Sequence, residues 1–273
     1  MVSKELIKKI RRIEIKANKL VEEIFSGEYR SGFRGKGIEF DDIRQYYPGD
    51  DVRNIDWNVT ARQNTAYVKQ FQEEREMNLF LLIDQSYSNN FGRKKDIIVE
   101  IGATLAFSAI RNNDKVGAML FTDQIEKLIP SKSGKRHVLS IIEDILRLEP
   151  ENKGTDLANA LHYFNKIVKK QSIVFLISDF LDSGFEKEIK ITAQKHDLVL
   201  LRIIDPTEEQ LPQGAIFAFE DLETGETMLV DNLKGEKSLN PVKNFSARNL
   251  INIYTDQDYV KGLKHFFKRR GWK

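Results

Sequence analysis

The sequence predicts an α/β protein built on a doubly wound, mainly parallel β-sheet, with an N-terminal helix and a small irregular β-containing appendage. Two observations support this prediction. From residue 77 onward, short apolar runs alternate with segments of helical periodicity. Several of these runs, such as MNLFLLID and IVFLIS, are continuously apolar, as is typical of parallel strands buried on both faces of a sheet.

The N-terminal segment 3–25 is predicted to be one amphipathic helix. Its apolar residues recur at alternating steps of four and three: Leu6, Ile10, Ile13, Ala17, Leu20 and Ile24. This stripe is also compatible with a coiled-coil seam of about three heptads. We favour a helix packed onto the body of the protein itself.

Residues 27–66 form a segment of a different kind, rich in Gly, Asp and Arg with scattered aromatic residues. It lacks a clean period, so we expect short strands and tight turns, with one turn at Pro48-Gly49-Asp50. Arg–Asp pairs involving Arg53 and Asp56 should order it, and Trp57, Phe40 and Tyr46 should be buried. We expect one domain at residues 1–75, comprising the helix and this segment, and a second at 76–273.

The arginines of this segment also permit a separate function, in which they grip phosphates or acidic peptides. These arginines are Arg30, Arg34, Arg44, Arg53 and Arg62, and the aspartates interleaved with them are Asp41, Asp42, Asp50, Asp51 and Asp56. Because opposite charges alternate so closely, we favour internal pairing.

The elements that follow can be predicted from period and turn signals. We expect strands at 66–73, 77–84, 116–122, 173–178, 198–204 and 250–254, an antiparallel partner at 125–130, a hairpin of 216–219 with 227–230, and helices at 96–112, 135–148, 156–169 and 185–195. Asn240-Pro241 indicates a further short helix. Thr255 and Asp258 resemble a capping box for the last helix.

Composition excludes several classes of function. The 43 basic and 41 acidic residues give a net charge of +2, too little for a protein that binds nucleic acid through a broad positive field. With no cysteine, the chain has no disulfide, thiolate metal site or cysteine nucleophile. No apolar run is long enough for a transmembrane segment, and MVSKELIKKIRR lacks the apolar core of a signal peptide. The expected location is cytoplasmic.

Oxygen-bearing side chains follow the predicted strands at one edge of the sheet. Asp84, Ser86 and Ser88 end the strand in LIDQSYS, Thr155 lies in KGTDL, and Asp179 follows IVFLIS. If the strands before Asp84 and Asp179 are neighbours, these five side chains converge, because ligands of doubly wound sheets bind beyond the carboxyl ends of the strands. Such an all-oxygen set suits Mg²⁺ or Mn²⁺. Each segment alone could instead be a helix cap or turn.

These residues carry a resemblance to a known fold and family. The pattern D-x-S-x-S, then a loop Thr, then a strand-end Asp resembles the metal-ion-dependent adhesion site of von Willebrand factor A (vWA) domains. The run RGKGIEFDDIRQYYPGDDVRNIDWNVTARQNTAYVKQFQEE resembles the N-terminal signature of bacterial "domain of unknown function 58" proteins. Larger members of that family carry membrane helices ahead of this signature, where this chain has the predicted helix 3–25.

The resemblance implies a non-catalytic protein-binding module. In vWA domains Ser and Thr oxygens hold Mg²⁺, the aspartates often act through water, and one metal position stays open for an acidic residue of a protein partner. Relatives are often encoded beside MoxR-type AAA+ ATPases, which implies a chaperone-like role in maturation or assembly. The loops around the site would contact the partner, and from them we select Asn89, Asn90, Gly154 and Asp182.

An alternative function is a Mg²⁺-dependent phosphohydrolase with Asp84 as nucleophile. Ser86 stands where such enzymes usually carry a second carboxylate, and no lysine is evident beside the site. The four histidines match no triad or metal spacing, and neither GFRGKG nor SKSGKRH has the spacing of a phosphate-binding loop. We therefore expect a protein that is not an enzyme.

Overall fold

The computed structural model describes residues 4–25, 39–63, 65–72, 76–90, 92–150, 152, 154–209, 216–220, 227–231 and 249–271. The chain divides into two compact units, one formed by Arg34–Met77 and the other by Met1–Phe33 together with Asn78–Lys273. The N-terminal helix thus lies in the unit of the large sheet, whereas the sequence-based limits group it with the segment that follows it. Among the described helices, none is both long enough and apolar enough to cross a bilayer.

A six-stranded sheet with the order β10-β7-β6-β3-β4-β5 forms the centre of the larger unit. Five strands are parallel, and β5 pairs antiparallel with β4. The strands are β3 (Asn78–Asp84), β4 (Lys115–Phe121), β5 (Ile125–Lys132), β6 (Ile173–Ser178), β7 (Asp197–Ile204) and β10 (Leu250–Tyr254). This arrangement confirms the predicted doubly wound, mainly parallel sheet.

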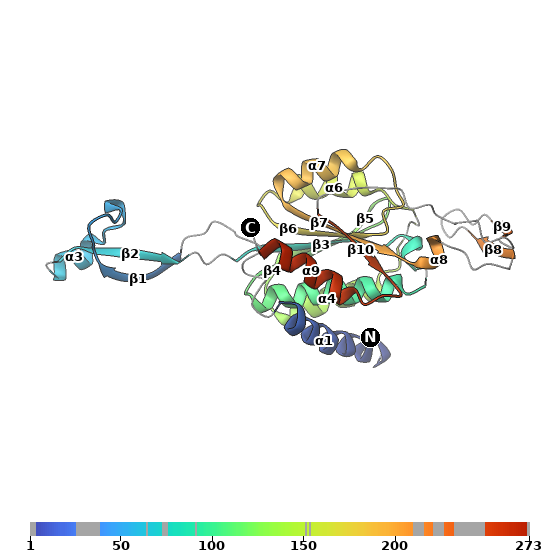
Figure 1. Ribbon diagram of the computed structural model, residues 1–273, viewed down its shortest axis with the longest axis horizontal. Coiled ribbons are helices and arrows are strands. Elements are labelled where there is room, and N and C mark those ends of the chain that lie inside the picture. Colours follow the sequence, from blue (N-terminus) through green and yellow to red (C-terminus); the bar gives the residue numbers. More distant parts are fainter. Residues whose placement is uncertain are drawn as a thin grey trace. The chain divides into compact units, whose positions relative to one another are not determined.

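Helices cover both faces of this sheet (Figure 1). Helices α6 (Leu157–Ile167) and α7 (Glu186–Lys195) pack together on one face; α4 (Lys94–Arg111), α5 (Lys135–Arg147) and α9 (Tyr259–Gly271) lie on the other. Because neither face meets water, β3 is buried from Leu79 to its end. The unit also contains the short helix α8 (Pro206–Glu209) and the predicted hairpin of β8 (Ile216–Glu220) with β9 (Thr227–Asp231). The short helix expected at Asn240-Pro241 lies outside the described residues.

Helix α1 (Lys4–Phe25) packs on the outer side of α4, as expected for a helix docked on its own protein. Its apolar stripe buries Ile13, Ala17, Leu20 and Val21. Two ion pairs flank this contact, from Lys9 to Asp96 at 3.0 Å and from Lys16 to Glu100 at 2.6 Å. Helix α4 is consequently covered by the sheet on one side and by α1 on the other, which explains why its sequence is apolar over most of its circumference.

The smaller unit consists of the antiparallel strands β1 (Glu39–Gln45) and β2 (Tyr67–Gln72), with the turn η1 (Val52–Asn54) and helix α3 (Trp57–Gln63) between them. Arg44 makes a two-pronged ion pair with Asp50, with both nitrogen–oxygen distances at 2.7 Å. The hydrogen bonds from Arg44 lower the pKa of Asp50 to about 2. Internal pairing of arginine with aspartate is therefore confirmed for this pair.

Arg53 and Asp56 are each in an ion pair, though not with each other, and the expected burial of Trp57 and of Tyr46 is wrong. Arg53 pairs with Asp51, whereas Asp56 caps α3 and lies 3.6 Å from the Lys69 ammonium. Trp57 has 69% of its surface exposed, because it starts a short helix beside a two-stranded sheet that offers little apolar cover. Tyr46 is half-buried, and the burial of Phe40 lies outside the described residues.

The predicted capping box of the last helix is also wrong. The Thr255 hydroxyl donates to Asp205 at 2.8 Å instead of capping the helix. Asp258 is the residue next to the helix start, and its carboxylate accepts the Val260 amide at 3.0 Å.

His196 provides a test of how this core responds to acid. The ring is 3% exposed and lies edge-on to Phe164 at 5.2 Å, and among the described residues neither ring nitrogen has a hydrogen-bond partner. Burial, with a contribution from Lys195, lowers the pKa of His196. The unfolded chain binds a proton here below about pH 6.5 while the folded protein does not, so stability must fall as pH falls through that value.

We predict that His196→Phe flattens the decline of unfolding free energy between about pH 6.5 and pH 5, where one such group contributes at most about 1.4 kcal/mol per pH unit. Urea unfolding at several pH values measures the slope. The exposed His162, replaced by Gln, serves as the control and should leave the slope unchanged. Equal slopes for wild type and His196→Phe would refute the assignment.

Candidate metal centre

The candidate site lies where the order of the strands reverses. After β3 the chain adds β4 on one side of it, and later β6 on the other. Strands β3 and β6 are hydrogen-bonded neighbours, with Ile83 opposite Ile177. Asp84, the last residue of β3, and Asp179, the first residue after β6, therefore lie at the same junction. The structure thus confirms the neighbouring strands that the sequence analysis required. Ligands of doubly wound sheets bind at such a switch point.

The turn after β3 orients the first group of predicted ligands. Asp84 is completely buried; one carboxylate oxygen accepts the Ser86 amide at 2.9 Å, and the other accepts the Ser178 hydroxyl at 2.6 Å. This turn brings the Ser86 and Ser88 hydroxyl oxygens to 3.1 Å from each other. The 3₁₀ turn η2 (Tyr87–Asn90) then leads toward α4. Two hydroxyls and one carboxylate are therefore held together at the end of the central strand.

Two carboxylates share this buried region, and they interact unfavourably. Burial and the nearby charge of Asp179 raise the pKa of Asp84 to about 7, although hydrogen bonds from Ser178 and Ser86 oppose the rise. Asp179 is itself only 3% exposed. A buried pair of like charges is stabilised by any cation placed beside it, so the electrostatics of the site favour binding of a positive charge.

Lys94 is such a cation, and the sequence analysis missed it. Its side chain is completely buried, and its ammonium lies 3.0 Å from an Asp179 carboxylate oxygen and 3.5 Å from the Ser88 carbonyl oxygen. The statement that no lysine lies beside the site is therefore wrong. Lys94 begins α4, six residues after Ser88, and a helix that follows a central strand starts at the same sheet edge. Its position at the start of this helix was therefore the sequence signal that could have placed Lys94 beside the site.

Ser178 is a second functional residue that the sequence analysis missed. Besides donating to Asp84, its hydroxyl accepts the Phe180 amide at 3.0 Å. Phe180 has a left-handed backbone, with φ of 57°. A non-glycine residue in this region is strained and persists where its surroundings hold it. The backbone beyond β6 is thus tied to Asp84 through one serine hydroxyl.

Thr155 lies one strand further along the same edge. Its neighbour Asp156 donates its amide to the Thr122 carbonyl at 3.2 Å, just beyond β4. Within the described part of the chain, the Thr155 side chain makes no hydrogen bond to the other predicted ligands. The Leu157 amide donates to Asp182 at 2.9 Å, which fastens the start of α6 to the loop after β6. The three predicted segments therefore meet at one edge, with Thr155 at its margin.

The residues expected to face a partner differ in how exposed they are and in what they hydrogen-bond to. Asn89 is 3% exposed and its side-chain amide donates to the Ser86 hydroxyl at 3.1 Å, so it supports the serine turn and its expected surface role is wrong in this structure. Asp182 is half-buried and accepts backbone amides. Gly154 is half-buried, and the Asn90 side chain lies outside the described residues.

The donor set fits a small hard cation. A hollow of about 10 Å³ borders Asp84, Ser86 and Asn89, which is about the volume one water molecule requires. The Asn89 side-chain oxygen is buried without a hydrogen-bond partner. Among the described residues no group of three or more His, Cys, Asp or Glu side chains is placed to hold a metal, so neutral oxygens must contribute. Mg²⁺ and Mn²⁺ accept such ligands.

The same geometry fits a phosphohydrolase poorly. The Asp84 carboxylate is completely buried, and each of its oxygens accepts a hydrogen bond. A nucleophile must reach the phosphorus atom, and complete burial keeps the Asp84 carboxylate away from a phosphate ester that arrives from solvent. Lys94 supplies the lysine that the sequence analysis did not find, but Ser86 still stands in place of a second carboxylate.

Comparison with known proteins establishes the family. The family model described as "Protein of unknown function DUF58" matches residues 42–239. The chain belongs to the DUF58 family. The uncharacterized protein Rv1480 of Mycobacterium tuberculosis (strain H37Rv) is 27% identical over 223 residues, covering 79% of this chain and 70% of Rv1480. The uncharacterized protein YeaD of Bacillus subtilis (strain 168) is 33% identical over 96 residues, covering 35% of this chain and 23% of YeaD.

Solved structures resemble this DUF58 chain at low sequence identity. A conserved hypothetical protein, BatB from Bacteroides thetaiotaomicron, has a TM-score of 0.47 and 14% identity, covering 72% of this chain and 100% of BatB. Proximal thread matrix protein 1 from the mussel byssus, described with zinc in its adhesion motif, has a TM-score of 0.39 and 18% identity, covering 48% and 38%. The fold of the DUF58 chain is the doubly wound, mainly parallel α/β sheet described above.

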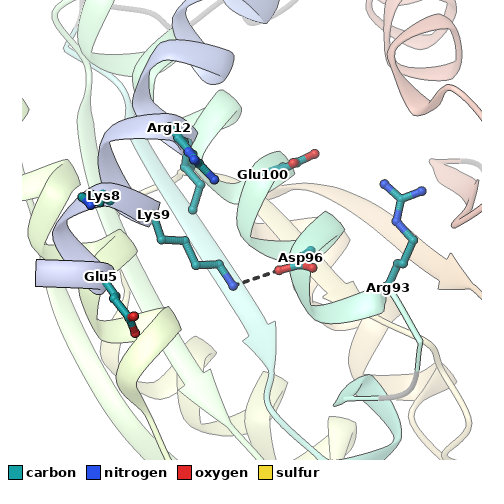
Figure 2. A pocket seen from close by; sticks show the side chains of 8 residues that line it. Glu5, Lys8, Lys9, Arg12, Arg93, Asp96 and Glu100 are labelled. Carbon is teal, nitrogen blue, oxygen red and sulfur yellow. Dashed lines mark hydrogen bonds and ion pairs between the residues drawn. The ribbon is translucent and has the colours of Figure 1, made fainter. Parts of the chain in front are cut away.

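A larger cleft of about 560 Å³ lies between α1 and α4 (Figure 2). Both acids of α4 that line it are neutralised: Asp96 pairs with Lys9, and Glu100 pairs with Lys16 and accepts the Tyr259 hydroxyl at 3.0 Å. Mixed charges that pair across two helices are typical of a helix-packing surface. The cleft is therefore explained by the docking of α1 on this DUF58 fold.

Ser178→Ala tests whether the Ser178 hydroxyl holds the site together. The substitution leaves a buried carboxylate with one donor fewer and the Phe180 amide without its acceptor, so we expect a loss of about 1–3 kcal/mol in unfolding free energy. Ser172→Ala is the matched control, because that buried serine donates to the nearby Lys170 carbonyl at 2.8 Å and precedes β6, at the end of that strand away from the site. Urea unfolding measures both. Losses of the same size would show that Ser178 has no special role.

Proposed function

We propose that this DUF58 chain is a non-catalytic, metal-dependent protein-binding module. Asp84, Ser86, Ser88, Thr155 and Asp179 hold one Mg²⁺ or Mn²⁺, and an acidic residue of a protein partner completes the site. The observation that carries this proposal is the turn after β3, in which the Ser86 and Ser88 hydroxyls lie 3.1 Å apart beside the buried Asp84 carboxylate.

The chemistry of the donors supports recognition of an acidic partner. Serine and threonine hydroxyls are neutral, so a divalent cation held mostly by them keeps much of its positive charge and attracts an external carboxylate. Asp84 is fixed by two hydrogen bonds and is therefore oriented before a cation arrives. Asn89 orients Ser86 in the same way.

Binding is favoured over catalysis by what surrounds the site. A reaction needs a reachable nucleophile or base and space for a substrate. Asp84 is buried and doubly hydrogen-bonded, and the hollow beside it measures only about 10 Å³. A partner that inserts one carboxylate from outside needs no such space.

For the partner, we propose a MoxR-type AAA+ ATPase or one of its clients. This choice follows the family resemblance carried by the signature segment and the D-x-S-x-S turn. The role would be chaperone-like, in the maturation or assembly of other proteins. Because the partner consumes ATP, the association would take place in the cytoplasm.

Asp84→Asn should abolish binding of Mg²⁺ and Mn²⁺ while the fold is retained. The amide keeps an oxygen to accept the Ser86 amide proton but removes the charge. Isothermal titration calorimetry should show one site in wild type and none in the variant, with circular dichroism unchanged. Asp144→Asn, which removes a surface partner of Lys127, is the control. Equal affinity in wild type and Asp84→Asn would remove the site assignment.

The double substitution Ser86→Ala with Ser88→Ala should abolish association with the partner. A purified MoxR-type ATPase from the same organism serves as bait, with Mg²⁺ or with EDTA. We expect capture only of wild type, and only with Mg²⁺, while melting temperatures in EDTA differ little. Capture that persists in EDTA or with the double variant would contradict an adhesion-type mechanism.

A further inference from the structure

We infer that Lys94 is a built-in cation that holds Asp179 in the metal-free protein and competes with the metal for it. This inference rests on the proposed metal site. It assigns to Lys94 the role of setting the metal affinity, a role that the D-x-S-x-S, Thr and Asp pattern does not contain.

The burial of Lys94 is the first observation. Its side chain has 0% exposure and that of Asp179 has 4%, and their charged atoms lie 3.0 Å apart. A buried ammonium is tolerated only where it is paired and hydrogen-bonded. The Ser88 carbonyl at 3.5 Å belongs to the same turn that carries the predicted metal ligands. The ammonium therefore bridges the first and third segments of the site.

The position of Lys94 in its helix is the second observation. Lys94 is the first residue of α4, where the helix dipole favours an anion over a cation. Helix formation therefore does not explain a lysine at this position. The nearby carboxylates do explain it, because they pair with its charge. Lys94 also acts on Asp205: burial opposes ionisation of that carboxyl, but hydrogen bonds from Thr207 and Thr255, with a smaller contribution from the Lys94 charge, lower its pKa. Gly92 lies against Asp205, and a Cβ atom there would be 2.5 Å from a carboxylate oxygen.

The charge balance of the site gives the consequence. When both are ionised, Asp84 and Asp179 carry two negative charges, of which the Lys94 ammonium offsets one. A divalent cation must then bind beside an ammonium that repels it and already occupies an oxygen of Asp179. The carboxylate of a partner would offset this repulsion, so metal and partner should bind more tightly together than separately.

Lys94→Met and Lys94→Gln test the competition. Calorimetry with Mg²⁺ and with Mn²⁺ should show affinity about tenfold or more higher in both variants than in wild type, which corresponds to about 1.4 kcal/mol. In EDTA both variants should melt at lower temperature than wild type, and Mg²⁺ should restore much of the loss. Lys127→Met, which removes the surface pair with Asp144, is the matched control and should bind metal as wild type does.

A measurement on the wild-type chain keeps the inference testable if the variants fold poorly. An amine-acylating reagent followed by mass spectrometry should label Lys94 little in EDTA and more at saturating Mg²⁺, because the metal takes Asp179 from it. Labelling of Lys127 should not change. Metal affinity that is equal or lower in the variants, or labelling of Lys94 that is insensitive to Mg²⁺, would overturn the inference.

The outcomes also separate this inference from the proposed function. If Lys94→Met binds Mg²⁺ and wild type does not, Lys94 replaces the metal in the native protein, and the metal-dependent function fails while the competition stands. If wild type binds Mg²⁺ and both Lys94 variants bind it equally well, the proposed function stands and the competition fails. If no form binds metal, both are wrong.

Discussion

The hydrogen bond between the Ser178 hydroxyl and the Asp84 carboxylate, at 2.6 Å, is the interaction on which the candidate site depends. It joins the ends of β3 and β6, the two strands between which the chain reverses direction across the sheet. Through the same hydroxyl, the strained Phe180 backbone is held in position, and Asp179 is thereby fixed beside Asp84. One neutral donor thus brings two carboxylates together that would otherwise repel each other.

The surrounding fold makes this interaction strong by excluding water from it. Helices cover both faces of the sheet, α1 packs on α4 in turn, and the side chain of Lys94 at the start of α4 is completely buried. A charge in such an environment must find a partner within the protein. Lys94 and Asp179 satisfy this requirement for each other.

The sequence predicts the elements of the large sheet well because their signals are local. The run of β3 is apolar without interruption, and the stripe of α1 has a clear helical period. Asp84, Ser86 and Ser88 can be grouped because a single turn carries them. Lys94 was missed because its signal was indirect: it lies at the start of the helix that follows β3, and its partner Asp179 is 85 residues away. The prediction that Trp57 is buried was wrong for a related reason. Burial depends on how large the local core is, and the neighbouring residues in the sequence do not reveal that size.

The presence of Lys94 gives a physical reason for the serine at position 86. A carboxylate at position 86, together with Asp84 and Asp179, would place three negative charges beside one buried ammonium. A divalent cation bound there would be neutralised by the protein's own carboxylates. A hydroxyl adds no charge, so among the predicted ligands the ammonium faces two carboxylates, those of Asp84 and Asp179. Under the proposed function, a cation that enters such a site leaves an excess of positive charge. That excess is what an acidic residue of a partner protein would neutralise.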